Sequence, residues 1–318
     1  MSLLLVAASA LLASAGLIWL RLRFAEVGLD QPGHRSLHSR PTPHGGGIGV
    51  VLAAVAVGVW AGAPPVWLVG AGMLALLSLI DDWRHLPFWL RLLVHLAVSA
   101  VVVFLHPAAS TLASLVVLVL IAWSINAYNF MDGSDGLAGS MAVVGFGAYA
   151  IGFAFANDAV LSALSAALAG GAAGFLIFNW HPARIFMGDV GSVPLGFLAS
   201  GLGWYGYWAG VWPGWFPLLV FAPFLLDASV TLLKRLLRRE RVWEAHRDHY
   251  YQRMVRLGES HAAVCVRWLR LMLVGGAWAV TLMLVGRTGW GWGVTLAWTG
   301  LLLLMGHRVD VRWNNKNK

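Results

Sequence analysis

The sequence predicts an all-α, polytopic integral membrane protein, and three observations lead to that prediction. Apolar residues make up 59% of the 318-residue chain, whereas Asp, Glu, Lys and Arg together make up 11%. The apolar residues are also gathered into long uncharged runs. So few charged side chains could not cover a soluble globule of this length, but the hydrocarbon belt of a bilayer needs none. A water-soluble protein is therefore excluded as a class, and residues 1–318 are predicted to form a single membrane domain.

About eleven apolar runs are each long enough to be predicted as a transmembrane helix. The first run is followed by Arg21 and Arg23 and has no basic segment before it, which predicts a retained anchor and not a cleaved signal peptide. Because several runs are shorter than 20 residues, the number of spans is predicted to within about one. The runs lie at 3–20, 48–63, 66–80, 92–105, 112–126, 139–156, 159–178, 193–209, 214–233, 269–286 and 290–306.

The positions of Lys and Arg predict the orientation, because cytoplasmic loops retain basic residues. With the N-terminus outside and the C-terminus inside, every Lys and Arg except Arg287 falls on the cytoplasmic side, if Arg270 at the edge of a span is included. The formal net charge of +8 is then a consequence of topology, and nucleic acid is excluded as a partner. The single Cys265 excludes a disulfide framework and a thiolate metal cluster. The predicted cytoplasmic segments are 21–47, 80–91, 127–138, 179–192, the larger loop 234–268 and the tail from 307.

The acidic residues are the main functional signal. All except Asp158 are assigned to the cytoplasmic side, although acidic residues contribute little to topology. A carboxylate beside hydrocarbon is costly unless it is paired or bound to a metal, so its presence indicates function. The carboxylates at the ends of apolar runs are Asp81, Asp82, Asp132, Asp135 and Asp189.

Asp81 and Asp82 close the third apolar run. Adjacent carboxylates raise each other's proton affinity unless a cation lies between them, which favours a base or a metal-linked role. A solvated helix end, with Arg84 and Arg91 as countercharges, explains the pair equally well.

The segment 126–138 contains two Asn and two Asp among glycines, between two apolar runs. Asp-Gly pairs are common in tight turns, so a simple connector is one interpretation. A connector rarely needs four acceptor side chains, however, whereas a site for a diphosphate, a sugar or Mg²⁺ does. We therefore favour a binding site here.

Asp189 lies between Gly188 and Gly191 in the segment 186–192. Glycines let a backbone approach a ligand closely, and a single hard carboxylate suits Mg²⁺ that is held largely through waters and substrate phosphates. The motif is weak alone and stronger in combination with the two segments above.

Two further segments have open interpretations. The glycines after Arg40 could help that residue cradle a phosphate, although glycine-rich loops before helices are common, and no Walker A sequence is present. His246 and His249, three residues apart, would share a face if their segment is helical, where they could meet phosphate or sugar hydroxyls. A Zn²⁺ site is the alternative, but no third ligand is evident nearby.

Together these motifs resemble those of the polyprenyl-phosphate N-acetylhexosamine-1-phosphate transferases. That family includes the phospho-MurNAc-pentapeptide translocase and the enzymes that begin enterobacterial common antigen, teichoic acid and O-antigen synthesis. The similarity follows the family's order along nearly the whole chain. It rests on Arg-Pro-Thr-Pro-His-Gly-Gly-Gly at 40–47, Asp81-Asp82, Asn-Ala-x-Asn-x-x-Asp-Gly-x-Asp-Gly at 126–136, Phe-Met-Gly-Asp-x-Gly-Ser at 186–192 and His246-x-x-His249.

The resemblance implies transfer of a sugar 1-phosphate from a UDP-N-acetylhexosamine to undecaprenyl phosphate, with release of UMP, at the cytoplasmic face of the bacterial inner membrane. It implies Mg²⁺, or Mn²⁺ in its place, as the cofactor, with Asp189 as the ligand. By position, the implied roles are catalytic for Asp81, Asp82 and Asp132, lipid-phosphate binding for Arg40 and Arg91, and nucleotide or sugar binding for Asn129, Asp135, Asn179, Phe186, His246 and His249.

The histidine segment departs from the translocase branch, which has consecutive histidines, because Arg247 and Asp248 separate the pair here. A MurNAc-pentapeptide substrate is therefore disfavoured. The stretch 242–253 looks more like the O-antigen-initiating transferases, some of which use 6-deoxy N-acetylhexosamines such as FucNAc or QuiNAc.

A proton- or Na⁺-coupled secondary transporter is the main rival from another class, with an inactive homologue as a third interpretation. Transporter sites lie near the bilayer midplane, often between internal repeats. The predicted spans show no internal repeat. Their centres are almost free of ionisable groups, with His95 as a modest exception. The sequence is compatible with a monomer or a homodimer, and does not identify the sugar.

Overall fold

The computed structural model describes residues 2–23, 29–30, 41–242 and 246–316. Within these ranges the chain is almost entirely helical, apart from one short antiparallel ribbon that pairs Leu29 with Pro43 and Asp30 with Thr42. The elements are α1 (Leu3–Arg23), β1 (Leu29–Asp30), β2 (Thr42–Pro43), α2 (Gly47–Ala61), α3 (Pro65–Arg84), α4 (Phe88–Leu105), α5 (Thr111–Phe130), α6 (Leu137–Phe155), α7 (Ala159–Asn179), α8 (Asp189–Trp208), α9 (Trp215–Leu237), α10 (Tyr250–Arg256), α11 (His261–Leu284), the 3-10 helix η1 (Thr288–Trp290) and α12 (Gly291–Lys316).

Every apolar run predicted as a span is a helix in the structure. Eight helices are long and apolar enough to cross a bilayer among the residues described, and α2 is a shorter apolar helix. The prediction of an all-α, multi-pass membrane protein is confirmed, while the number of spans stays a prediction. The loop predicted at 234–268 is partly helical, because α9 extends to Leu237, α11 begins at His261, and α10 lies between them.

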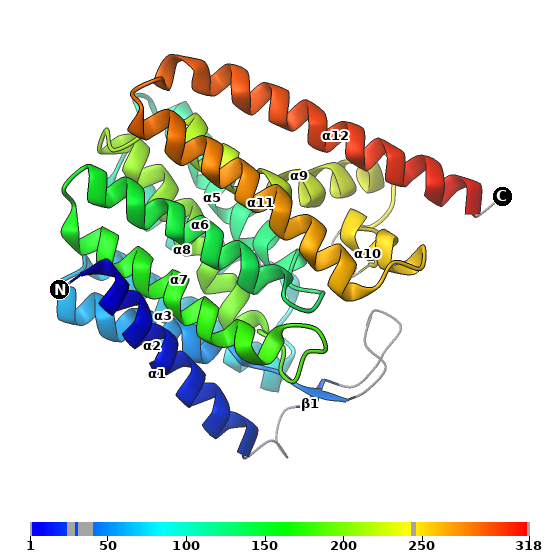
Figure 1. The fold of residues 1–318 in the computed structure, drawn as a ribbon, viewed down its shortest axis with the longest axis horizontal. Helices are drawn as coiled ribbons and strands as arrows, with labels where there is room; N and C mark the ends of the chain where they lie inside the picture. Colours follow the sequence, from blue (N-terminus) through cyan, green and yellow to red (C-terminus); the bar gives the residue numbers. More distant parts are fainter. Residues whose placement is uncertain (1, 24–28, 31–40, 243–245, 317–318) are drawn as a thin grey trace.

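The long helices run side by side, and the start of α1 and the end of α12 lie at opposite ends of the bundle (Figure 1). We call one end the α10 end: it carries α10, the β1–β2 ribbon and the connections α3–α4, α5–α6 and α7–α8. Opposite termini agree with an odd number of crossings. Which end faces the cytoplasm stays a prediction.

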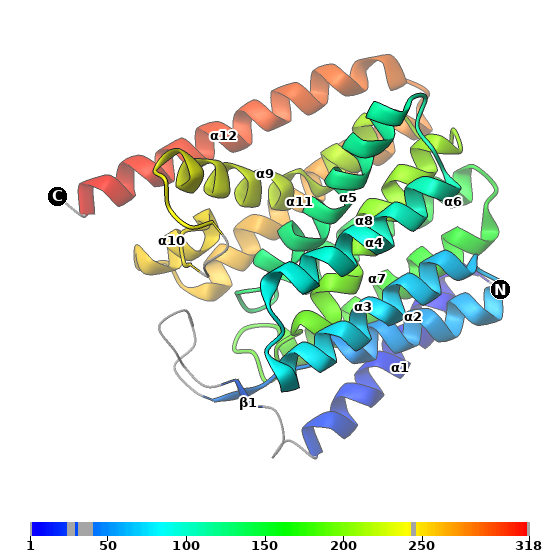
Figure 2. The ribbon, with the colours of Figure 1, turned by 180° about the vertical axis from the view of Figure 1, so that it is seen from behind.

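The core is built around α7 and α8. Helix α7 packs against α1, α2 and α6, while α8 packs against α3 and α5, which lie towards the viewer in Figure 2. A Cβ on Gly170 or Gly174 would lie 2.1 Å from the Ala7 carbonyl oxygen or 2.4 Å from that of Leu11. Glycines four residues apart let two membrane helices approach this closely, as small residues commonly do. This packing holds the helices that carry the candidate site.

Exposed tryptophans lie near both ends of the bundle. Trp83 and Trp89 are exposed at the α10 end, and Trp60, Trp208 and Trp292 at the other. Tryptophan is enriched where a transmembrane helix meets the lipid headgroups. The two groups therefore support a bilayer position for the bundle.

Candidate active site

Arg91 connects two of the predicted carboxylates at the α10 end. Its Nη1 lies 2.7 Å from Asp81 Oδ2 and 4.0 Å from Asp189 Oδ2, so the end of α3 and the starts of α4 and α8 meet at one guanidinium. Helix α3 ends at Arg84, and in the turn that follows the Leu86 amide donates to Asp81 Oδ1 at 2.7 Å. Asp81 is thus fixed by two donors and in turn fixes Arg91.

Asp82 is the less constrained member of the pair. Its side chain is 30% exposed, compared with 13% for Asp81. His44 Nδ1 lies 3.7 Å from Asp82 Oδ2, which is within ion-pair distance if the imidazole is protonated. His44 lies inside the 40–47 motif but is not among the site residues predicted from the sequence. Arg40, from the same motif, lies outside the described residues.

The glycine motif packs the start of α2 against the start of α8. The amides of Gly46 and Gly47 donate to the carbonyl oxygens of Phe186 and Met187 at 2.9 and 3.0 Å. A Cβ on Gly47 would lie 2.3 Å from Gly191 Cα. These two amides are occupied, so the interpretation of the glycines as a phosphate cradle is wrong for them. Their structural effect is to place the loop that carries Asp189.

Asn129, at the end of α5, holds the start of α8. Ser192 Oγ donates to Asn129 Oδ1 at 2.5 Å, and the Asn129 amide also hydrogen-bonds to the Asp189 carboxylate. Gly188, which precedes the first residue of α8, has a positive φ of 72°, a conformation that favours glycine. The conformation of Asp189 is therefore set by α5 and by its own loop.

Asp132 completes the acidic cluster, which we define as Asp81, Asp82, Asp132 and Asp189. Burial, together with the nearby carboxylate of Asp189, raises the pKa of Asp132 well above its usual range, while a hydrogen bond from the Gly188 backbone acts in the opposite direction. Arg91 is the guanidinium that contacts two members of this cluster. The cluster thus holds more carboxyl groups than the Arg91 guanidinium pairs with, and a bound cation would favour their ionised forms.

The chemistry of the donors fits Mg²⁺ through a single carboxylate. Among the described residues, no group of three or more His, Cys, Asp or Glu side chains could hold a metal ion alone. Mg²⁺ often binds through one or two carboxylates, with substrate phosphates and waters completing the octahedron. Asp189 beside Asp132 suits that arrangement better than a closed metal cage.

Asp135 and Asn179 shape the loops around the cluster. Asp135 Oδ2 accepts from the Ala183 amide at 3.1 Å and lies 2.6 Å from His181 Nδ1. Asn179 accepts from the Gly136 amide and donates to the Ile185 carbonyl, both at 2.9 Å. Both side chains are buried and engaged with the protein, so the structure shows them organising the segments 131–136 and 180–188. Their role towards a nucleotide stays a prediction, as does that of the partly buried Phe186.

His246 and His249 lie together, with ring centroids 4.8 Å apart, but they do not share a helix face, because α10 begins only at Tyr250. His249 is buried, and its Nδ1 is 3.3 Å from Asp227 Oδ1. Burial, helped by His249 and Arg235, lowers the pKa of His246 to about 4. His246 is therefore a neutral hydrogen-bonding group near pH 7.

Asp227 is not among the site residues predicted from the sequence, where it was assigned to the cytoplasmic side although it lies inside the run 214–233. In the structure it is a buried residue of α9, and its carboxylate accepts from the amides of Tyr250 and Tyr251 at 2.8 and 3.2 Å. It satisfies the first free amides of α10, as a helix cap does. An acidic residue inside an apolar run was the signal that could have found it.

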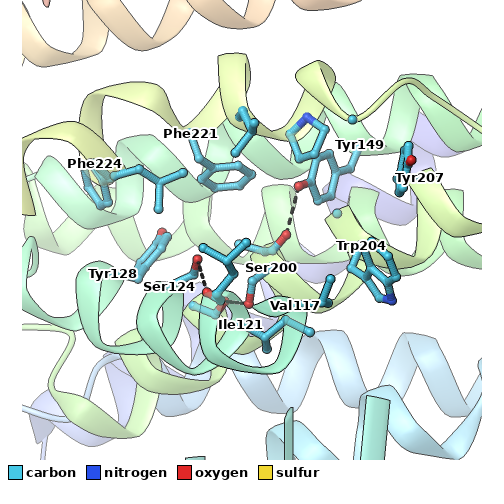
Figure 3. Close-up of a pocket in the computed structure, with 18 of the residues that line it drawn as sticks. Val117, Ile121, Ser124, Tyr128, Tyr149, Ser200, Trp204, Tyr207, Phe221 and Phe224 are labelled. Carbon is cyan, nitrogen blue, oxygen red and sulfur yellow. Dashed lines mark hydrogen bonds between the residues drawn. The ribbon is translucent and has the colours of Figure 1, made fainter. Parts of the chain in front are cut away.

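An apolar cavity of about 340 Å³ lies between α5, α8 and α9 (Figure 3). Tyr128 and Phe224 line it toward the α10 end, and Trp204 and Tyr207 line it near the other end. The hydroxyl of Ser200 donates to a backbone carbonyl of its own helix, and so does that of Ser124. The cavity therefore offers mainly hydrocarbon, and Tyr128 is adjacent in sequence to Asn129 of the site.

Comparison with known proteins shows what this arrangement is similar to. The sequence profile of glycosyl transferase family 4 matches residues 65–206, a range that contains all four members of the acidic cluster. The phospho-N-acetylmuramoyl-pentapeptide-transferase of Synechococcus sp. (strain RCC307) is 31% identical over an alignment of 320 positions that covers 86% of each chain. This chain belongs to the polyprenyl-phosphate hexosamine-1-phosphate transferase family.

Other members of the family have similar coverage. The probable undecaprenyl-phosphate N-acetylglucosaminyl 1-phosphate transferase of Bacillus subtilis (strain 168) is 28% identical over an alignment of 254 positions, which covers 73% of this chain and 71% of that protein. The decaprenyl-phosphate N-acetylglucosaminephosphotransferase of Mycobacterium leprae (strain TN) is 27% identical over an alignment of 301 positions, which covers 77% of this chain and 75% of that protein. The predicted resemblance is thereby confirmed.

Proposed function

We propose that this transferase moves an N-acetylhexosamine 1-phosphate from a UDP-sugar to undecaprenyl phosphate and releases UMP. The observation that carries the proposal is the meeting of Asp81, Arg91 and Asp189 at one end of a membrane bundle. The names of the relatives support a polyprenyl-phosphate acceptor and, in two of them, an N-acetylglucosamine 1-phosphate group. We further propose that the product begins an O-antigen or a related cell-envelope polysaccharide.

The reaction requires alignment and neutralisation of charge more than a strong nucleophile. An oxygen of the lipid phosphate attacks the β-phosphorus of the UDP-sugar, the bond from that phosphorus to the bridging oxygen breaks, and the bridging oxygen leaves with UMP. Phosphoryl transfer of this kind depends on positioning and electrostatics. Mg²⁺ bound at Asp189 would supply charge neutralisation for the diphosphate.

The residues around Arg91 suit the lipid phosphate. Arg91 is 39% exposed, so one side of its guanidinium is open to a ligand while the other side holds Asp81. We assign Arg91 to orient the lipid phosphate. Asp82 is the better candidate for a base, because Asp81 is occupied by Arg91 and by the Leu86 amide.

The apolar cavity suits the polyprenyl chain. It lies along α5 and is lined by Tyr128, whose neighbour in sequence, Asn129, contacts Asp189. A lipid with its phosphate at Arg91 could therefore lie with part of its chain along this cavity. Phe186, on the loop before Asp189, is the candidate to stack on uracil, and His246 is the candidate to meet the sugar.

In the proposed topology, the α10 end lies at the cytoplasmic face of the bacterial inner membrane, and UDP-sugars are found in the cytoplasm. A reporter fused after Lys318 should then be active in the cytosol. A cysteine introduced in the segment 238–242 should resist a reagent that reaches only the periplasm. Periplasmic labelling would overturn the topology.

The function is tested with purified protein, undecaprenyl phosphate, Mg²⁺ and a panel that includes UDP-GlcNAc, UDP-FucNAc and UDP-QuiNAc. We expect release of UMP with at least one donor, and only when the lipid phosphate is present. UMP release from none of a wide panel, together with ion-coupled uptake by vesicles containing the protein, would support the transporter alternative instead.

A further inference from the structure

We propose that Asp310, near the end of the last helix α12, is a positioning residue for the site: it holds α10, and α10 in turn holds the turn that carries Asp132. Four contacts carry the inference, and each joins segments far apart in the sequence. The expected change in enzyme kinetics rests on the proposed transferase function, whereas the chain of contacts from Asp310 to the turn does not.

The first contact joins α12 to α10. Asp310 Oδ1 accepts from Arg253 Nη1 at 3.0 Å, and Asp310 Oδ2 accepts from the hydroxyl of Tyr250 at 3.2 Å. Tyr250 and Arg253 are three residues apart and therefore lie on one face of α10. A Cβ on Gly306 would lie 2.9 Å from Tyr250 Cζ, so the glycine lets the tyrosine ring lie against α12.

Two further groups reinforce this contact. Lys234 of α9 forms an ion pair with Asp310 and a 2.6 Å hydrogen bond to the Tyr250 hydroxyl. The guanidinium of Arg256 lies 4.4 Å from the ring centroid of Trp313, one turn after Asp310 on α12. Asp310 is thus the carboxylate shared by side chains from α9 and α10, and its own side chain is only 16% exposed.

The second contact caps α10 from α9. Asp227 accepts from the amides of Tyr250 and Tyr251, so the helix is held at its start by α9 and along one face by α12. A helix of 7 residues is too short to be stable in water by itself. The position of α10 therefore depends on these external contacts.

The third and fourth contacts join α10 to the site. The hydroxyl of Tyr251 donates to the Phe130 carbonyl oxygen at 3.1 Å, two residues before Asp132. A Cβ on Gly133 would lie 2.2 Å from the same hydroxyl, so the turn after Asp132 has room for Tyr251 only because it has a glycine there. A shift of α10 would move this hydroxyl against the turn. The chain of contacts from Asp310 therefore ends at the backbone on both sides of Asp132.

The first test is structural and needs no substrate. In Asp310→Asn, the charge that holds Lys234 and Arg253 is lost, so amides in 249–256 and in 130–136 should exchange hydrogen at least about tenfold faster than in the wild type. Glu259→Gln is the matched control: it removes a carboxylate that pairs with Arg267 and Arg312 near the same end of α12, while the contacts of Asp310 with Tyr250 and Arg253 are kept. Unchanged exchange at 130–136 in Asp310→Asn would overturn the proposal, as would equal acceleration in the control.

The second test uses Tyr251→Phe, which keeps the buried ring and removes the single hydroxyl that reaches Phe130. It guards against the case in which Asp310→Asn fails to fold. We expect the KM for the UDP-sugar to rise about three- to tenfold in both variants, as loss of one or two hydrogen bonds would produce, with the KM for undecaprenyl phosphate unchanged. A fall in maximal rate with both KM values unchanged would mean that the substitution lowers only the amount of folded enzyme. That result would overturn the positioning role.

The two proposals fail separately. If the wild-type protein releases no UMP while Asp310→Asn still loosens 130–136, the proposed reaction is wrong and the contact chain stands. If the wild type is active and neither variant changes exchange at 130–136, the contact chain is wrong and the proposed reaction stands.

Discussion

Two groups of carboxylates lie at the same end of the bundle, and they differ in how fully protein donors surround them. Asp227 and Asp310 each accept from several amide, hydroxyl or cationic donors and are mostly buried. Asp82 and Asp189 are about one-third exposed, and the nearest basic groups stand 3.7 and 4.0 Å away. Saturated carboxylates stabilise the fold, whereas the incompletely paired ones retain free capacity for a cation or a phosphate-bound ligand. The comparison predicts that substitutions in the first group will mainly lower stability. Substitutions in the second group will mainly lower activity.

The largest effect is expected from Asp189→Asn. Asn keeps the shape and one acceptor but removes the charge that binds a hard cation, so UMP release should fall by roughly 100-fold or more. Stability should change little, because Asp189 is incompletely paired. The assay is UMP release at equal membrane expression across a Mg²⁺ titration.

Asp158→Asn is the control for that experiment. Asp158 caps α7 by accepting from the Leu161 amide at 2.9 Å, and Asn caps helices equally well. Asp158 precedes α7 at the end of the bundle opposite the α10 end. A helix of this length places it roughly 30 Å from the site. Near-normal turnover by Asp189→Asn at low Mg²⁺ would contradict the metal assignment, and loss of activity in Asp158→Asn would mean that the site is misplaced.

The next effect concerns the lipid phosphate. In Arg91→Gln the guanidinium that links Asp81 to Asp189 is lost, and the KM for undecaprenyl phosphate should rise about tenfold or more, since hydrogen bonds to charged groups contribute about 1.5–3 kcal/mol. Arg84→Gln, an exposed neighbour at the end of α3, should behave as the wild type. Equal effects of the two substitutions would mean that only the local positive charge matters.

Asp227→Asn should show the reverse pattern. Because its carboxylate holds the amides of Tyr250 and Tyr251, the substitution should cost about 1–3 kcal/mol of folding free energy and lower the apparent melting temperature in detergent by several degrees. Asp82→Asn, measured beside it, should leave that temperature within a degree or two. Equal melting of both variants would remove the distinction between the two groups.

The smallest effect concerns pH and His246. Because the pKa of His246 is lowered to about 4, an unfolded chain binds its proton on acidification below about pH 6.5, while the folded chain does not until about pH 4. Folded-state stability should therefore fall as the pH drops through that window. His246→Gln should reduce the fall, measured as the difference in apparent melting temperature between pH 7 and pH 5, and an unchanged difference would contradict the burial of this imidazole.

Much of the fold follows from the sequence, because a bilayer forces apolar segments into helices. Every predicted run is a helix, and the clustering of Asp81, Arg91 and Asp189 agrees with their common place at span ends. What the sequence did not reveal depends on tertiary contacts. The sequence left open whether the glycines at 46 and 47 cradle a phosphate or belong to an ordinary loop, and in the structure they pack against a distant loop.

The second carboxylate group was the harder part to predict. Asp227 was grouped with the loop residues, because a sequence does not show that the first amides of a later helix will reach back to it. Gly133 lies in an Asp-Gly pair, which is common in turns, yet in the structure it also makes room for a tyrosine far along the chain. Neither relation has a periodic signal, so both required the structure.

The most direct test of the central claim follows the β-phosphorus. Purified protein is incubated with undecaprenyl phosphate, Mg²⁺ and an accepted UDP-sugar labelled at the β-phosphate, and the lipid and aqueous fractions are separated. The proposed reaction predicts that the label enters the lipid fraction in an amount equal to the unlabelled UMP released, and that Asp189→Asn forms neither product. Label that remains in the aqueous fraction as UDP would mean that the sugar moves without its phosphate, and would contradict the account.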